Sequence, residues 1–213
     1  MAWQPRPRSH LVTVVSKATF VLDQGELELA PAQEPIVRED TFLNDDPGRS
    51  LLWASDVVPS KPKCDVVVIG HAFANDDRGA QSVVARLVLA PIDKRIDVVA
   101  DRAVGPDGTV YQGPRFHRIP LLYERTAGGP GTWNPVGVRS TSRDAYGRAP
   151  LPNIVPHGQA GETATMPEPV GFGPICATWK QRADKLGFHA FGPNGWAGEP
   201  IPEGFDLSYF NCA

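Results

Sequence analysis

The chain has 213 residues, of which 41% are hydrophobic and 21% are charged, an ordinary composition for a globular protein that can bury a core. Its formal net charge of −3 excludes the strongly basic surface on which most nucleic-acid-binding proteins depend. The 21 glycines and 22 prolines argue against long helices, because both residues destabilise a helix interior, and they favour strands joined by many turns.

The cellular location is predicted from three features of the sequence. The apolar runs are too short to span a bilayer, and the basic, proline-rich N-terminal segment lacks the apolar stretch of a signal peptide. Cys64, Cys176 and Cys212 are widely spaced and form no Cys-x-x-Cys pair, which predicts reduced thiols. We therefore expect a cytoplasmic protein with no membrane insertion.

The N-terminal part of the chain predicts a hairpin. Residues 10–22 are rich in β-branched residues and partly alternate in polarity, which predicts a strand. A turn at 23–25 that ends in glycine and a return strand over 26–30 complete the hairpin. The proline-rich segment that follows is expected to be irregular, with short strands near 36–38 and 51–53.

The strongest apolar run, residues 64–74, lies between a proline and a polar turn, which predicts a buried central strand. Residues 82–90 and 95–102 are also short apolar runs, and each follows a short turn. The three segments together predict an antiparallel meander, and their spacing is typical of a sandwich or barrel.

The second half of the chain is richer in loops. Residues 111–123 predict one or two further strands, and residues 125–173, dominated by Gly, Pro, Asn, Arg and Thr, predict a long ordered loop that packs on the sheets. A short helix is predicted from Pro174 to Gly187, because proline favours the first turn of a helix and glycine the position after its end.

We therefore predict a single domain over residues 1–213. Its fold class is all-β or β-dominant, antiparallel and sandwich-like, with one short helix and long ordered loops. The last residues, 205–213, are apolar and aromatic, whereas chain ends are usually polar, so we expect the N-terminal part of a longer protein.

The sequence contains no motif of a known catalytic or cofactor site. There is no Gly-x-Ser-x-Gly, and Cys64 and His71, seven residues apart, would lie on opposite faces of one strand. The glycines of 128–131 are not followed by the Lys-Ser/Thr of a phosphate-binding loop. The histidines occur singly, without the spacing of metal ligands: His10, His71, His117, His157 and His189. We expect a non-enzymatic protein with no cofactor and no metal.

The candidate partner-binding residues lie in and beside the long loop. Aromatic rings there could stack on a ligand or peptide, and the arginines could dock an acidic partner. The alternative is that Glu124 and Arg125 tie the loop down, that Trp133 fills a gap in the core, and that the arginines are solvated. The candidates are Tyr123, Glu124, Arg125, Trp133, Asn134, Arg139, Arg143, Arg148 and Trp179.

Six strings, taken in order, resemble the bacterial domain-of-unknown-function family 2169 over nearly the whole chain. They are SDVVPSKPKCDVVVIGHAFA (55–74), IPLLYERTAGG (119–129), NPVG (134–137), LPNI (151–154), GFGPI with Trp179 and Arg182 (171–182), and PEGFDLSYFN (202–211). The resemblance implies an adaptor or chaperone of type VI secretion that helps load an effector onto the spike, with effector and spike proteins as partners. It supplies no catalytic residues.

Two other functions stay open on the sequence. A carbohydrate- or ligand-binding β-sandwich would use a cleft lined by Tyr123, Trp133 and Trp179. A hydrolase would require at least two side chains to converge within hydrogen-bond distance. The side chains in question are His71, His117, His157, Glu124 and Cys64.

Overall fold

The computed structural model describes residues 2–6, 9–22, 25–57, 65–130, 132, 134–139, 141–161 and 166–176. Its strands are β1 (Ala2–Arg6), β2 (Ser9–Val12), β3 (Phe20–Val21), β4 (Glu28–Leu29), β5 (Thr41–Phe42), β6 (Leu51–Trp53), β7 (His71–Phe73), β8 (Ser82–Leu89), β9 (Ile92–Val99), β10 (Arg102–Val104), β11 (Val110–Gln112), β12 (Arg118–Pro120), β13 (Ala149–Leu151) and β14 (Ile154–Pro156). Two 3₁₀ turns, η1 (Leu43–Asp45) and η2 (Tyr123–Arg125), complete the elements. Every pairing between these strands is antiparallel, so the predicted β-dominant, antiparallel fold is confirmed.

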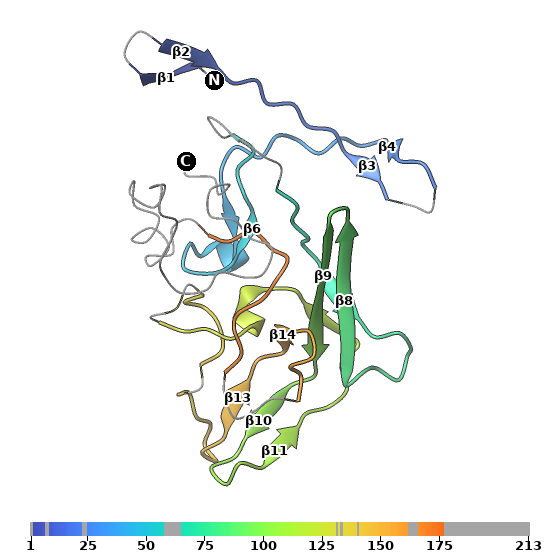
Figure 1. The fold of residues 1–213 in the computed structure, drawn as a ribbon, viewed down its shortest axis with the longest axis vertical. Helices are drawn as coiled ribbons and strands as arrows, with labels where there is room; N and C mark the ends of the chain where they lie inside the picture. Colours follow the sequence, from blue (N-terminus) through green and yellow to red (C-terminus); the bar gives the residue numbers. More distant parts are fainter. Residues whose placement is uncertain are drawn as a thin grey trace.

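The central element of the fold is a long bent strand made of β9 and β10 (Figure 1). β9 lies between β8 and β14, and β10 lies between β11 and β13. Arg102 comes four positions after Val98, whereas their partners Leu151 and Ile154 are three positions apart. The β9–β10 strand therefore carries one extra residue at the corner. Such a bulge bends a strand and increases its twist. The two three-stranded sheets are therefore consecutive halves of one bent ribbon.

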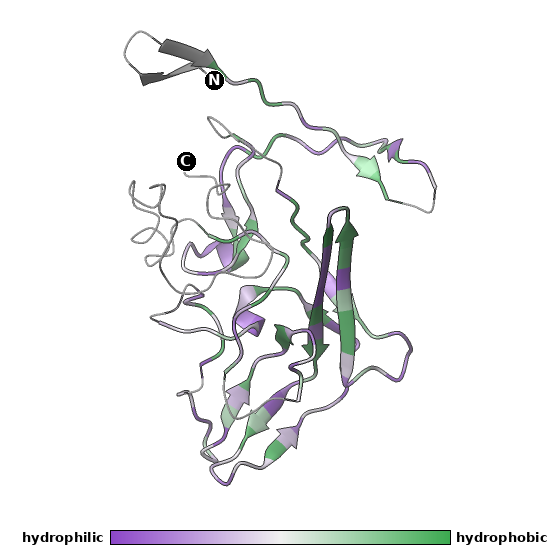
Figure 2. Cartoon of the chain, in the orientation of Figure 1, coloured by the Kyte–Doolittle hydropathy of each residue, from purple (hydrophilic) through white to green (hydrophobic). Residues whose placement is uncertain are grey.

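Alternation along the β8–β9 hairpin places the core on one face of the sheet. Ile96 and Val98 of β9 are fully buried, and their cross-strand partners Ala85 and Val83 pack against the same cluster. Figure 2 shows hydrophobic residues along both strands of this hairpin. The other members of the cluster come from β7, β12, β14 and the segment 166–176: Ala72, Ile119, Ile154, Val170 and Phe172.

Residues 65–74, the described part of the predicted central strand, do not form one continuous strand. Only His71–Phe73 is a strand; it pairs with β12 and has one buried residue, Ala72. The residues before it alternate between exposed and half-buried, and the Val68 N–H donates to the Phe172 carbonyl over 2.9 Å. The predicted meander is therefore wrong in its first strand, because β7 pairs with β12 and Val68 bonds Phe172 rather than a neighbouring strand, whereas the β8–β9 hairpin is confirmed.

The N-terminal prediction is partly confirmed. Residues 10–22 form two separate strands: β2 pairs with β1, and β3 pairs with β4 in the predicted hairpin, whose Gly25 has a φ of 133°. A strand over 51–53 is confirmed as β6, whereas 36–38 are irregular. Pairing within this hairpin covers two residues of β3, and Thr19 before it bonds the Gln33 side chain as well as the backbone N–H of Ala30.

The second half matches the prediction in its strands and differs in its loop. Residues 111–123 supply β11 and β12 as expected. The segment 125–173, predicted to be a loop, also contributes β13 and β14, which pair with β10 and β9. Most of the predicted helix at 174–187 lies outside the described residues. In the described part of the chain, no helix is long and apolar enough to cross a membrane.

Side-chain truncation should lower the free energy of unfolding more on the buried face of the hairpin than on its exposed face. We expect Ile96→Ala, at a fully buried position, to lower the free energy of unfolding by about 2–5 kcal/mol, because it leaves a cavity. Val84→Ala, on the outward face of the paired strand, should cost less than about 1 kcal/mol. Urea denaturation measures both, and equal losses would contradict this assignment of faces.

Candidate functional site

The η2 turn lies where several distant segments of the chain meet. The Tyr123 ring is buried, with 3% of its surface exposed, and its hydroxyl donates to the Gly173 carbonyl over 2.9 Å. A Cβ at Gly171 would lie 2.8 Å from the ring, closer than real Cβ contacts, so only glycine allows this approach. Leu51, Ile175 and Cys176 complete the apolar cluster around the ring. Tyr123 thus fixes the segment 171–176 against η2.

Glu124 clamps a loop that lies more than seventy residues earlier in the chain. Its Oε1 accepts the backbone N–H of Ser50 over 2.9 Å, and its Oε2 accepts the Ser50 hydroxyl over 2.5 Å. Ser50 is buried, and its carbonyl accepts the N–H of Leu43. Hydrogen bonds to a charged acceptor are stronger than neutral ones, so this pair holds the loop 46–50 firmly beside η2.

Arg125 reaches the corner between β9 and β10. Its guanidinium lies 3.1 Å from Asn153 Oδ1 and 3.4 Å from Asp101 Oδ1, and the Asn153 amide donates to the Val99 carbonyl and to Asp101. The ion pair with Asp101 is largely exposed to solvent and contributes little stability. The amide contacts, which are more buried, are what position the turn against the sheet.

Asn134 fastens the loop that follows η2. Its side-chain Nδ2 lies 2.9 Å from the Tyr123 carbonyl, 2.7 Å from Thr126 Oγ1 and 2.8 Å from the Ala127 carbonyl. The residue is fully buried between two glycines: a Cβ at Gly128 would lie 2.2 Å from its carbonyl oxygen, and one at Gly137 would lie 2.4 Å from Nδ2. The glycine-rich sequence therefore serves close packing around one amide.

Several predicted partner-binding residues are thus engaged within the chain. Tyr123, Glu124, Arg125 and Asn134 each contact other segments of the chain. Of the two residues that the alternative assigns to tying down the long loop, Arg125 contacts Asn153 within that loop, whereas Glu124 binds Ser50 outside it. Trp133 and Trp179 lie outside the described residues. Because Tyr123 is buried, its ring is not exposed for stacking on a sugar, which disfavours a carbohydrate site built on the three aromatics.

The predicted arginines fall in different environments. Arg148 donates to Asp144 over 2.7 Å and lies over the rings of Tyr111 and Tyr146, so it belongs to its own turn. The backbone N–H of Arg148, helped by its guanidinium, holds the pKa of the Asp144 carboxyl below its ordinary value. Arg143 donates to the neighbouring Ser142 carbonyl.

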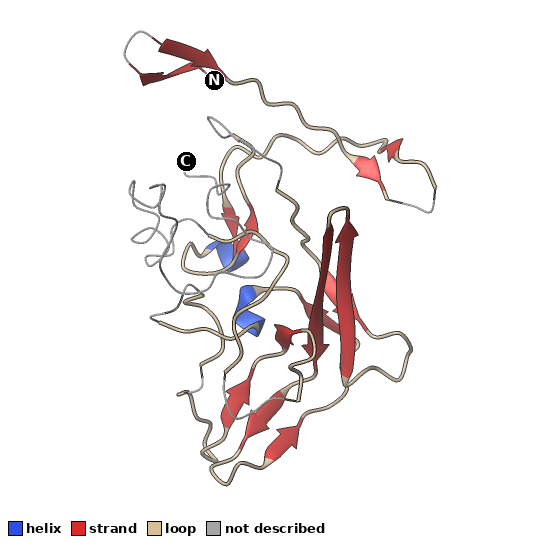
Figure 3. Cartoon of the chain, in the orientation of Figure 1, coloured by secondary structure: helices blue, strands red, loops and turns tan. Residues whose placement is uncertain are grey.

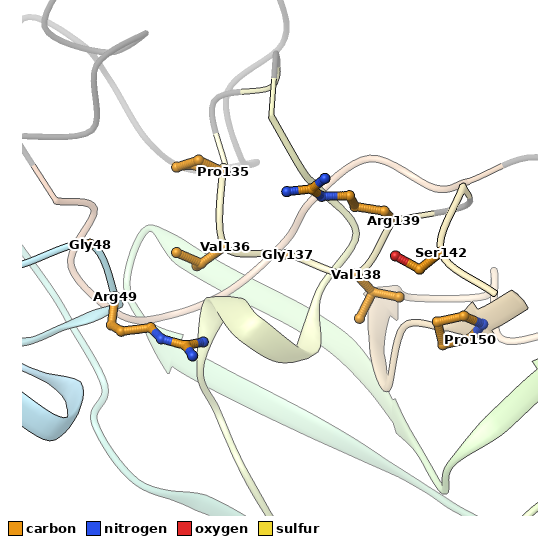
Figure 4. Close-up of a pocket in the computed structure, with 9 residues that line it drawn as sticks. All are labelled: Gly48, Arg49, Pro135, Val136, Gly137, Val138, Arg139, Ser142 and Pro150. Atoms are coloured by element: carbon orange, nitrogen blue, oxygen red, sulfur yellow. The ribbon is translucent and has the colours of Figure 1, made fainter. Parts of the chain in front are cut away.

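Arg139 is exposed and borders an open groove of about 500 Å³ that the sequence did not predict. The groove lies between residues 48–49 on one side and residues 135–139 and 142 on the other, and Figure 4 shows the Arg49 and Arg139 side chains on opposite sides of the segment Val136–Gly137. Nothing in the sequence links these arginines, which are ninety residues apart; the Glu124–Ser50 clamp brings their loops together. The lining residues are Gly48, Arg49, Pro135, Val136, Gly137, Val138, Arg139, Ser142 and Pro150.

The residues proposed for a hydrolase are distributed over separate contacts. His157 Nδ1 lies 2.7 Å from Asp97, Glu124 binds Ser50, and the His71 ring lies 6.0 Å from that of Phe73. No hydrogen bond joins any two of the proposed residues within the described ranges, and Cys64 lies outside them. Within the same ranges, no three His, Cys, Asp or Glu side chains lie together as the ligands of a metal ion would.

Asn134 offers a direct test of the packing around η2. We expect Asn134→Leu, close in size, to lower the free energy of unfolding by at least about 2 kcal/mol, because buried oxygens lose their donor. Asn75→Leu, at an exposed position, is the matched control and should change the value by about 0.5 kcal/mol or less. If chemical denaturation gave the same small change for both, the amide would not be holding the loop.

Comparison with known proteins supports the resemblance of these strings to a bacterial family. Four of the six strings by which the chain resembles a bacterial family, at 119–129, 134–137, 151–154 and 171–176, meet at this turn. Neither a curated protein nor a solved structure matches the chain. One family model matches residues 8–213; its description is an uncharacterized protein conserved in bacteria, DUF2169. The chain therefore belongs to the bacterial DUF2169 family.

Proposed function

We propose that this chain is a non-enzymatic, cytoplasmic adaptor of type VI secretion, which binds an effector and helps load it onto the spike. The resemblance to the family in sequence suggests this role, and the surface of the molecule supports protein binding. The supporting observation concerns the arm, defined as residues 12–22 and 25–29, which extends away from the β8–β11 sheets (Figures 1 and 3).

The arm exposes a concentration of large apolar side chains. Seven of them have exposed fractions between 46% and 87%: Val12, Val14, Phe20, Val21, Leu22, Leu27 and Leu29. Single apolar residues are normal on a protein surface, whereas a concentration of them favours an interaction site, and these seven all lie between positions 12 and 29. Burial of apolar surface is the main favourable contribution to most protein–protein association. The arm is therefore suited to bind a protein partner.

The base of the arm is tied to the rest of the chain. The Gln33 side chain bonds both the N–H and the carbonyl of Thr19 and also the carbonyl of Ala30. Lys17 lies 2.9 Å from Asp56. These contacts present the apolar hairpin in a defined position, which lowers the conformational entropy lost when a partner binds.

The test is capture of an effector or spike protein encoded beside this gene. The full chain, co-expressed with each candidate, should retain at least one of them on an affinity column. Leu22→Ser with Leu29→Ser should reduce retention at least about tenfold, because it removes apolar contact from the arm.

Val84→Ser with Val88→Ser is the matched control, since it removes two comparably exposed apolar residues from β8 and should leave retention unchanged. If the wild-type chain retained no candidate and its deletion left effector delivery intact, the adaptor function would be wrong. Equal retention by both double variants would exclude the arm as the binding surface.

A further inference from the structure

The groove beside η2 has an unbalanced positive charge. Arg49 and Arg139 line it, and none of the lining residues that the structure describes is acidic. The nearest carboxylate described for Arg49 is Asp46 at 3.8 Å, and Asp46 already accepts the N–H of Gly48 through its other oxygen. Both members of this pair are about half exposed, so the contact neutralises the guanidinium weakly.

The backbones that carry the two arginines are held in place. Arg49 precedes Ser50, which Glu124 clamps through two hydrogen bonds. Arg139 follows Val138, whose N–H donates to the Thr126 carbonyl and whose carbonyl accepts the N–H of Gly128. A Cβ at Gly129 would lie 2.6 Å from Cγ of Arg139, which shows that the stem of this arginine lies directly on the glycine.

The rest of the lining has the composition of a peptide-binding surface. Pro135, Val136, Val138 and Pro150 offer apolar contact, and the Ser142 hydroxyl offers a hydrogen-bond donor. A volume of about 500 Å³ accommodates a few side chains. Guanidinium groups bind carboxylates through two parallel hydrogen bonds, which gives directional as well as electrostatic recognition.

We propose that this groove binds an acidic, carboxylate-bearing segment of a protein partner, with Arg49 and Arg139 as the residues that recognise it. The proposal rests on the adaptor function and assigns a chemistry to part of the partner. A nucleic acid fits less well, because two arginines on a chain of net charge −3 make no extended basic track. The arm and the groove then contribute apolar and ionic contacts respectively.

Fluorescence polarisation tests the groove without knowledge of the partner. The probes are a labelled peptide of alternating glutamate and valine and the same peptide with glutamine for glutamate. The wild-type chain should bind the acidic peptide at least about tenfold more tightly, and added salt should weaken that binding. The variant R49Q/R139Q should lose this preference, whereas R78Q/R118Q, a control of equal charge at exposed positions elsewhere, should keep it.

The charge-reversed variant R49E/R139E tests whether the charge of these two side chains sets the peptide preference. It should reject the acidic peptide and prefer a matched lysine peptide, with circular dichroism unchanged from wild type. Equal binding of both original peptides by the wild type, or an acidic preference retained in R49Q/R139Q, would overturn the proposal. A single-stranded oligonucleotide that bound more tightly than the acidic peptide, in the same arginine-dependent way, would also overturn it.

The capture assay separates this proposal from the adaptor function. If the wild type and R49Q/R139Q retained the effector equally and neither showed an acidic preference, the groove proposal would fail and the adaptor function would stand. If no effector or spike protein were retained but the arginine-dependent peptide preference were present, the adaptor function would fail and the anion-binding groove would stand.

Discussion

The structure depends on one short turn, η2, whose three residues hold segments that are distant in the sequence. Tyr123 fixes 171–176 through its ring and hydroxyl, Glu124 clamps Ser50, and Arg125 reaches the bent corner of the sheet. The Tyr123 carbonyl also accepts the amide of Asn134. Buried polar groups of this kind are costly unless they are satisfied, so these contacts specify one arrangement of the loops rather than many.

The two surfaces proposed to bind a partner depend on the fold in different ways. The groove exists because η2 brings the loop 48–50 beside the loop 134–139, so its charge is a product of tertiary structure. The arm is a local hairpin, and its contact with the remainder of the chain runs through side chains such as Gln33 and Lys17. A partner that used both surfaces would gain apolar burial from one and ionic specificity from the other.

The sequence predicted what local patterns determine. Short apolar runs joined by a turn predicted the β8–β9 hairpin, and a turn that ends in glycine predicted β3–β4. The prediction of a central strand over the apolar run 64–74 is wrong because its composition does not reveal that Val68 bonds Phe172 and that β7 pairs with β12. Arg49 was missed for the same physical reason: its partnership with Arg139 depends on the Glu124–Ser50 contact, which no sequence spacing indicates. The alternative for Glu124 named the wrong loop: its carboxylate binds Ser50 in the loop 46–50, not the long loop that follows it in the sequence.

Native-state hydrogen exchange would test most directly whether η2 holds these loops as one unit. Three amides report on it: Ser50, which donates to Glu124, Thr126, which donates to the Tyr123 carbonyl, and Val138, which donates to the Thr126 carbonyl. A common opening predicts that all three share one protection free energy and one dependence on low urea concentrations. Three unequal values, with Ser50 and Val138 exchanging freely while Thr126 stays protected, would show that the loops open independently and would contradict the account.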